Sequence, residues 1–120
     1  MYLLEIDHKN NRVHLTLSER FDEAQAHSLL RELRQRFEEL GEDFHVLCDM
    51  TSLTEFEHSA RPHFRAMMDV CNEGGVKKII RILPNPLHDF GLTVMSHFHY
   101  GNGVQIVTCK TFDEALKHLR

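Results

Sequence analysis

The sequence has little of what marks a membrane, secreted or metal-rich protein. No apolar run approaches the ~20 residues that span a bilayer, and the N-terminus lacks the basic-then-apolar order of a signal peptide. The three cysteines, Cys48, Cys71 and Cys109, have no C-x-x-C spacing, and each lies in an apolar pattern, as reduced structural thiols usually do. We therefore expect a cytoplasmic protein with no membrane span.

The sequence also has no excess of basic charge. The 14 Lys and Arg residues are interleaved with 18 Asp and Glu, and the net charge is −4, so the chain offers no concentrated basic surface for nucleic acid. The apolar fraction of 42% and the charged fraction of 27% are those of an ordinary globular protein. There are no repeats or long linkers, and 120 residues predict a single domain over 1–120.

Histidine is the compositional oddity, with 10 copies. Only His97 and His99 come close together, and residues two apart on a helix point to different sides, so we expect no metal site and no cofactor. Partial protonation of the histidines near pH ~6 would take the net charge toward zero and tune association.

Five segments have the patterns of β-strands. Residues 2–7 and 12–17 alternate apolar with polar, and "HKNN" between them supplies turn chemistry, so they predict an antiparallel hairpin. Residues 43–50 have apolar side chains on both faces, Phe44 on one and Leu47 on the other, which is typical of a central strand. The last two strands are expected at 76–83 and 104–109.

Three helices are predicted at 22–40, 86–98 and 111–119. In the first, apolar residues recur at steps of three and four, and Gly41 is expected to cap the end. Asn85 is placed to cap the second of these, and Thr111 opens a capping box with Glu114 in the third.

A further helix is predicted after the strand at 43–50. An apolar stripe runs from Ala60 to Cys71, and Pro62 is tolerated only if the helix begins within a few residues before it. Ser59 is the expected N-cap, although Thr54 and Glu57 would also fit a capping box for a short separate turn. The element order is then β-β-α-β-α-β-α-β-α, which predicts an α/β fold with a mixed five-stranded sheet packed against helices.

This order, with the strand end "LCDMTSLTEF", the helix "ARPHFRAMM", the strand "VKKIIRIL" and the closing "TFDEALKHL", resembles the STAS-like bacterial domains related to anti-sigma-factor antagonists. The resemblance spans nearly the whole chain. It implies a non-enzymatic regulatory module in bacterial signalling that binds a protein partner, with a kinase or an anti-sigma-like protein as candidates. A homodimer is a further candidate assembly.

The resemblance also implies where a switch would lie. In switch-type antagonists, a serine near the start of the second helix is phosphorylated by a partner kinase. Counting residues places Asp49 at the strand-end aspartate, Glu57 at the acidic residue before the switch and His58 at the phosphorylated serine. Ser59 follows directly. The usual acceptor position is therefore not matched in this chain.

The residues around this junction have two interpretations each. Ser59 either caps the helix or accepts a phosphate that the helix N-terminus stabilises. Thr51 and Ser52 either satisfy local backbone groups or are weaker phosphate acceptors, and Asp49 is expected to order the loop by accepting backbone N–H bonds. Our candidates for partner binding are Asp49, Thr51, Ser52, His58 and Ser59.

Two alternatives to partner binding stay open. The carboxyl ends of the parallel strands would gather Asn85, His88, Lys110 and Thr111, a set suited to an anion or a small polar ligand. Exposed aromatic and Met side chains around the helices at 60–71 and 86–98 would form a groove for an apolar ligand, or a dimer surface. The sequence contains no nucleophile elbow, phosphate loop or metal motif, so an enzyme is the less favoured hypothesis.

Overall fold

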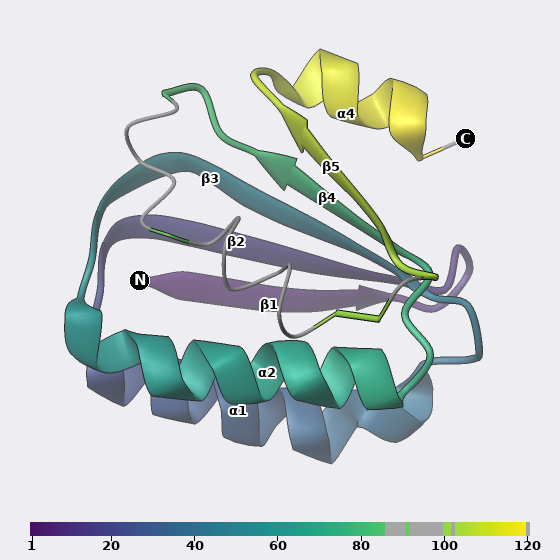
Figure 1. Cartoon of the computed structure of the whole chain (residues 1–120), viewed down its shortest axis with the longest axis horizontal. Coiled ribbons are helices and arrows are strands. Elements are labelled where there is room, and N and C mark those ends of the chain that lie inside the picture. Colours follow the sequence, from purple (N-terminus) through teal and green to yellow (C-terminus); the bar gives the residue numbers. More distant parts are fainter. Residues whose placement is uncertain (86–90, 92–99, 102, 120) are drawn as a thin grey trace.

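The computed structural model describes residues 1–85, 91, 100–101 and 103–119. Five strands form one sheet in the order β1-β2-β3-β4-β5 (Figure 1). They are β1 (Tyr2–Asp7), β2 (Arg12–Phe21), β3 (His45–Phe56), β4 (Lys78–Ile82) and β5 (Gln105–Cys109). β1 is antiparallel to β2, and each later pair of neighbours is parallel. The predicted mixed five-stranded sheet is confirmed.

The turn of the β1–β2 hairpin is tied to the loop that leads into β3. Asn10 donates to Asp7 from its backbone N–H at 3.1 Å and from its side chain at 2.8 Å. Asn11 takes a left-handed φ of 51°, which asparagine tolerates. Its side chain donates to the Glu42 carbonyl at 2.8 Å and accepts from the Gly41 N–H at 2.7 Å. These bonds help to set the starting register of β2 and β3.

Helices cover both faces of the sheet. In Figure 1, α1 (Glu23–Arg36) and α2 (Arg61–Glu73) lie side by side along one face, and α4 (Phe112–His118) lies on the other. The larger part of the core, with Val46 and Cys48 of β3, packs beneath α1 and α2. The smaller part includes Leu47 and packs beneath α4. As predicted, β3 is buried on both faces.

The first helix ends earlier than predicted. α1 starts after Asp22, whose carboxylate accepts the Gln25 N–H at 2.8 Å. The α-helix stops at Arg36, and a 3₁₀ turn over Phe37–Glu39 completes the segment. The expected Gly41 cap is wrong, because Leu40 closes the turn with its N–H on the Phe37 carbonyl at 3.1 Å. A 3₁₀ turn tightens the chain and satisfies helix-end carbonyls without a glycine.

The largest correction concerns β3, which we predicted to end at residue 50. It continues to Phe56 because β2 also continues, to Phe21, and the two pair along this extension. The predicted loop of hydroxyl residues is therefore a strand. The register shifts twice, and the second shift leaves Thr54 as an extra residue between the pairs Glu19–Leu53 and Arg20–Glu55. Such a bulge lets Leu53 and Phe56 both face the core although they are three residues apart.

The remaining predictions divide between confirmed elements and undescribed ones. β4 and β5 lie within the predicted ranges, and α4 begins after Thr111 as expected. The predicted helix at 86–98, and with it the capping role of Asn85, lies outside the described residues. Among the helices of the described part, none is long and apolar enough to cross a membrane.

Candidate functional site

The candidate site is the part of β2 and β3 that extends beyond the other strands. β1 pairs with β2 only as far as Leu17, and β4 pairs with β3 only as far as Asp49. We call the remaining segments, Ser18–Phe21 and Met50–Phe56, the arm. In Figure 1 the arm curves away from β4 and leads directly into the start of α2. Within the described ranges, no strand pairs with the outer edge of β3 along the arm.

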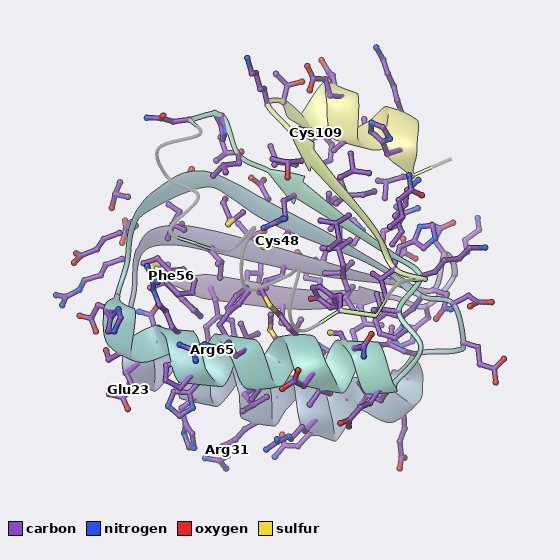
Figure 2. The ribbon with its side chains drawn as sticks, in the orientation of Figure 1. Glu23, Arg31, Cys48, Phe56, Arg65 and Cys109 are labelled. Atoms are coloured by element: carbon purple, nitrogen blue, oxygen red, sulfur yellow. The ribbon has the colours of Figure 1, made fainter. Side chains whose placement is uncertain are left out.

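Aromatic packing fixes the inner face of the arm. Figure 2 shows Phe56 where β3 meets α2. The centroid of its ring lies 5.2 Å from that of Phe21 and 5.3 Å from that of Phe64, and the rings of Phe21 and Phe64 are 6.1 Å apart. Leu53 is buried beside them. Such ring pairs add to the free energy gained by burying the side chains. The outer face of the arm is therefore presented on a well-supported backbone.

The outer face is polar and accessible. Its exposed side chains on the strand and the following turn are Thr51, Ser52, Thr54, Glu55, His58 and Ser59. Four of our five candidates for partner binding, Thr51, Ser52, His58 and Ser59, are thus exposed along the arm and the turn that follows it. The fifth, Asp49, is half-buried at the point where β4 ends its pairing with β3.

Asp49 orders the start of the arm. Its Oδ1 accepts the Thr51 backbone N–H at 2.9 Å and the Thr51 hydroxyl at 2.5 Å. The prediction that Asp49 accepts a backbone N–H is confirmed, although the segment it orders is strand instead of loop. Both of these hydrogen bonds come from Thr51, and among the described residues no hydrogen bond or ion pair joins Asp49 to a histidine, as a hydrolytic site would need.

The N-cap role expected for Ser59 is wrong. A 3₁₀ turn over His58–Ala60 precedes α2, the N-cap position is Ala60, and no side chain caps the helix there. Pro62 sits in the first turn of α2, as expected, and has no N–H that needs a cap. The hydroxyl of Ser59 instead donates to Glu57 Oε1 at 3.1 Å.

The alternative capping box is also wrong, and its two residues hold the arm together in another way. The Thr54 hydroxyl donates to the Glu19 carbonyl at 2.9 Å, at the bulge where Glu19 has a left-handed φ of 56°. Glu57 forms an ion pair with Arg20, which also lies 3.5 Å from Glu55. Sequence reasoning missed Arg20, because only the register of β2 and β3 shows that it faces these carboxylates.

Of the four candidates for ligand binding, Thr111 has a structural role. Thr111 Oγ1 accepts the Glu114 N–H at 3.2 Å and caps α4, as predicted. The Glu114 carboxylate accepts the Lys110 backbone N–H at 3.0 Å, one residue before the position of a standard capping box. Lys110 and Asn85 have exposed side chains, and His88 lies outside the described residues. Of the described members of this set, Thr111 therefore caps α4, and Lys110 and Asn85 lie on the surface.

The cysteines are inert and the described histidines form no metal cluster. Cys48, Cys71 and Cys109 are all free and buried, as predicted. Burial raises the pKa of Cys48 and of Cys71 to about 12, so both stay protonated thiols. In the described part of the chain, no group of three or more His, Cys, Asp or Glu residues is arranged to hold a metal ion. His97 and His99 lie outside that part.

One buried residue was not singled out by the sequence analysis. Arg81 on β4 is 5% exposed and lies beside a small cavity under α2. The available signal was the one cation within the apolar run "IIRIL" (79 to 83), which an interpretation by periodicity alone treats as a surface position.

Comparisons with known proteins agree on the fold. No family model and no curated protein matches the chain. An uncharacterised protein from Shewanella loihica PV-4 with a SpoIIAA-like fold superposes with a TM-score of 0.75 at 12% identity, covering 99% of this chain and 93% of that one. The anti-sigma factor antagonist SpoIIAA in its unphosphorylated form gives 0.65 at 15% identity, covering 100% and 98%.

A third structure has the same arrangement. An anti-sigma factor antagonist from Mycobacterium paratuberculosis gives a TM-score of 0.63 at 13% identity, covering 100% of this chain and 93% of that one. At these identities the likeness concerns the fold alone. The chain has a SpoIIAA-like fold, which is the fold that the resemblance drawn from its motifs implies.

Proposed function

We propose that this STAS-like domain is a non-enzymatic regulatory module of the bacterial cytoplasm that binds another protein through the outer face of the arm. The observation that carries the proposal is the row of exposed polar side chains from Thr51 to Ser59 on a backbone held from beneath by three aromatic rings. Polar groups displayed on a rigid support lose little conformational entropy when a partner binds. In this proposal, residues 1–120 act as a single domain.

The arm offers a partner both side chains and backbone. In the described residues, the outer edge of β3 is unpaired along the arm, so a partner segment can add a strand there by backbone hydrogen bonds. Beside that edge lie the carboxylate of Glu55 and the hydroxyl of Ser52, both exposed. A partner with basic and hydrogen-bond-donating groups is complementary to this surface. Two of the similar structures are named as anti-sigma factor antagonists, which favours a kinase or an anti-sigma-like protein as the partner here.

Ser59 is the hydroxyl that we propose as the site of control. It is exposed, and its hydroxyl donates to Glu57, which in turn pairs with Arg20. A phosphate on Ser59 would end this hydrogen bond, repel the Glu57 carboxylate and compete with it for the Arg20 guanidinium. The surface from the turn to β2 would then rearrange. Thr51 is less suited because its hydroxyl is held by Asp49, and Ser52 is the second candidate.

The experiment is affinity capture from the native cytoplasm with wild-type protein and two charge-reversal variants, followed by intact-mass and phosphosite analysis. Glu55→Lys changes the outer face of the arm. Glu42→Lys makes the same change in an exposed residue before β3, at the opposite end of that strand. We expect Glu55→Lys to lose a sigma-regulating or kinase-like partner that Glu42→Lys retains. Equal capture by both variants would place the interface elsewhere.

A third variant, Ser59→Glu, tests the proposed control point. We expect it to weaken partner binding while the midpoint of thermal unfolding stays within a few degrees, because Ser59 caps no helix. An unchanged affinity would remove Ser59 as the control point. Recovery of an unmodified homodimer from the cytoplasm, with no second protein, would count against the partner-binding proposal itself.

A further inference from the structure

Arg81 is a buried cation in the middle of the fold. It pairs in register with Cys48 of β3 and lies two residues after Ile79, so all three side chains point toward the layer beneath α1 and α2. The side chain is 5% exposed. Charged residues are almost never buried to this extent unless a partner group neutralises them.

The described residues do not supply that partner. Nε and Nη1 of Arg81 are buried and have no hydrogen-bond acceptor among them. A buried donor without an acceptor is costly, and such groups in native proteins usually mark an ion, a water or a ligand. Arg81 is also one of the residues that line a cavity of about 20 Å³ between the sheet and α2.

The other walls of the cavity favour a molecule that is apolar except for a negative charge. Most of the lining is aliphatic, aromatic or thioether, including Met67 and Met68 of α2. The remaining polar groups of the lining are the Cys48 thiol and the Tyr100 phenol, and burial raises the pKa of both, so both can donate a hydrogen bond. None of the described residues of the lining carries a carboxylate.

We propose that this cavity binds a monocarboxylate with a short apolar chain. The carboxylate of the ligand accepts hydrogen bonds from the Arg81 guanidinium, and the hydrocarbon chain of the ligand contacts the apolar lining. A volume of about 20 Å³ holds about one water molecule, so the lining has to move to admit the carboxylate as well as the hydrocarbon chain. The unbranched side chains of Met67 and Met68 adapt to make room for the chain. This site is separate from the arm and does not depend on the function proposed for it.

The test is calorimetric titration of the full chain with butyrate, with butylammonium and butanol as probes of equal length but different charge. Three proteins are compared: wild type, Arg81→Met and Lys110→Met. Lys110 is an exposed cation just after β5 and was one of the anion-binding candidates. We expect only butyrate to bind, with equal affinity in wild type and Lys110→Met, and at least about tenfold more weakly in Arg81→Met.

Several outcomes would overturn the proposal. Equal butyrate binding by Arg81→Met, or a loss confined to Lys110→Met, would place the anion site away from the cavity. If chloride bound as tightly as butyrate, the hydrocarbon chain of the ligand would contribute nothing to the affinity. Asp89 lies outside the described residues and is the one acid between positions 86 and 99. If Asp89→Asn bound butyrate more tightly than the wild type, the protein itself would supply the carboxylate that pairs with Arg81.

If Arg81→Met does not fold, a second measurement tests whether butyrate binds in the cavity. Butyrate added to wild-type protein labelled with ¹³C on the Met methyl groups should shift the resonances of Met67 and Met68, which line the cavity. The Met1 methyl group, which belongs to an exposed side chain, serves as the internal control. Unchanged Met67 and Met68 resonances at saturating butyrate would exclude binding in the cavity.

Discussion

Arg81→Met keeps a long unbranched side chain beneath α2 and removes only the charge and its N–H groups. Without an added carboxylate, the wild-type protein holds this cation where neither Nε nor Nη1 meets an acceptor among the described residues. Methionine is about as long and suits an apolar lining. We therefore expect the variant to be more stable than the wild type in a buffer free of carboxylates.

The size of the effect follows from the groups that are removed. Each buried donor without an acceptor costs about 1–3 kcal/mol. Replacing buried ionic groups by apolar ones of similar volume stabilises proteins by up to about 4 kcal/mol. An increase of about 1–4 kcal/mol in the free energy of unfolding is thus expected. For a chain of 120 residues this corresponds to a rise of about 4 °C in Tm for each kcal/mol.

Urea denaturation at low ionic strength is the suitable assay, since urea is uncharged and guanidinium chloride would add anions. Arg65→Met is the matched control, because Arg65 is an exposed residue of α2 (Figure 2). The control should change the free energy of unfolding by less than about 0.5 kcal/mol. Adding butyrate should then stabilise the wild type and leave Arg81→Met unchanged.

The opposite sign would refute the reasoning. If Arg81→Met lost about 3 kcal/mol or more while Arg65→Met was unchanged, the guanidinium would have to be half of an intact buried ion pair, since breaking such a pair has a cost of this size. The cavity would then have no unsatisfied cation to offer a ligand.

Phe56→Ala should lower the free energy of unfolding by about 3–5 kcal/mol, since the ring is 5% exposed and packs against Phe21, and a loss below about 1 kcal/mol in a urea melt would contradict the packing of the arm. Thr111→Ala should cost about 1 kcal/mol through loss of the α4 cap, whereas Ser59→Ala should cost less than about 0.5 kcal/mol. Equal losses in the two melts would contradict the assignment of caps. Burial holds the pKa of His14 below its ordinary value of 6.5, so its contribution to stability is complete above that value and decreases as the pH falls below it. His14→Gln should therefore flatten the pH dependence of the urea midpoint between about pH 7 and 5, and an unchanged slope would exclude His14 as a cause.

Local sequence signals predicted the elements whose stability is decided by near neighbours. The hairpin of β1 and β2 follows from alternation and a polar turn, and Thr111 caps α4 from three residues away. The order of strands and helices predicted a sheet with parallel later strands, because short crossovers place successive strands beside one another. These signals also carried the resemblance to STAS-like domains, and the comparisons of structure confirm the fold that it implied.

The site was harder to predict, because its residues depend on partners that are distant in sequence. Thr51 to Thr54 were predicted as loop, since hydroxyl residues after an aspartate favour turns. They form a strand because β2 extends beside them, and the bulge at Thr54 changes the alternation that a periodic reading looks for. Ser59 was expected to cap α2, but the 3₁₀ turn at His58–Ala60 leaves it facing Glu57.

By itself, the sequence determined the type and order of the described elements and the solvent-facing side of most of them, because propensity, alternation and capping act over a few residues. The tertiary structure decided which polar groups meet. It set Arg20 against Glu57 across the arm, 37 positions apart, and it buried Arg81 beneath α2 by placing β4 between two neighbouring strands. Burial and pairing at such separations are set by packing of the whole sheet, for which local sequence has no signal.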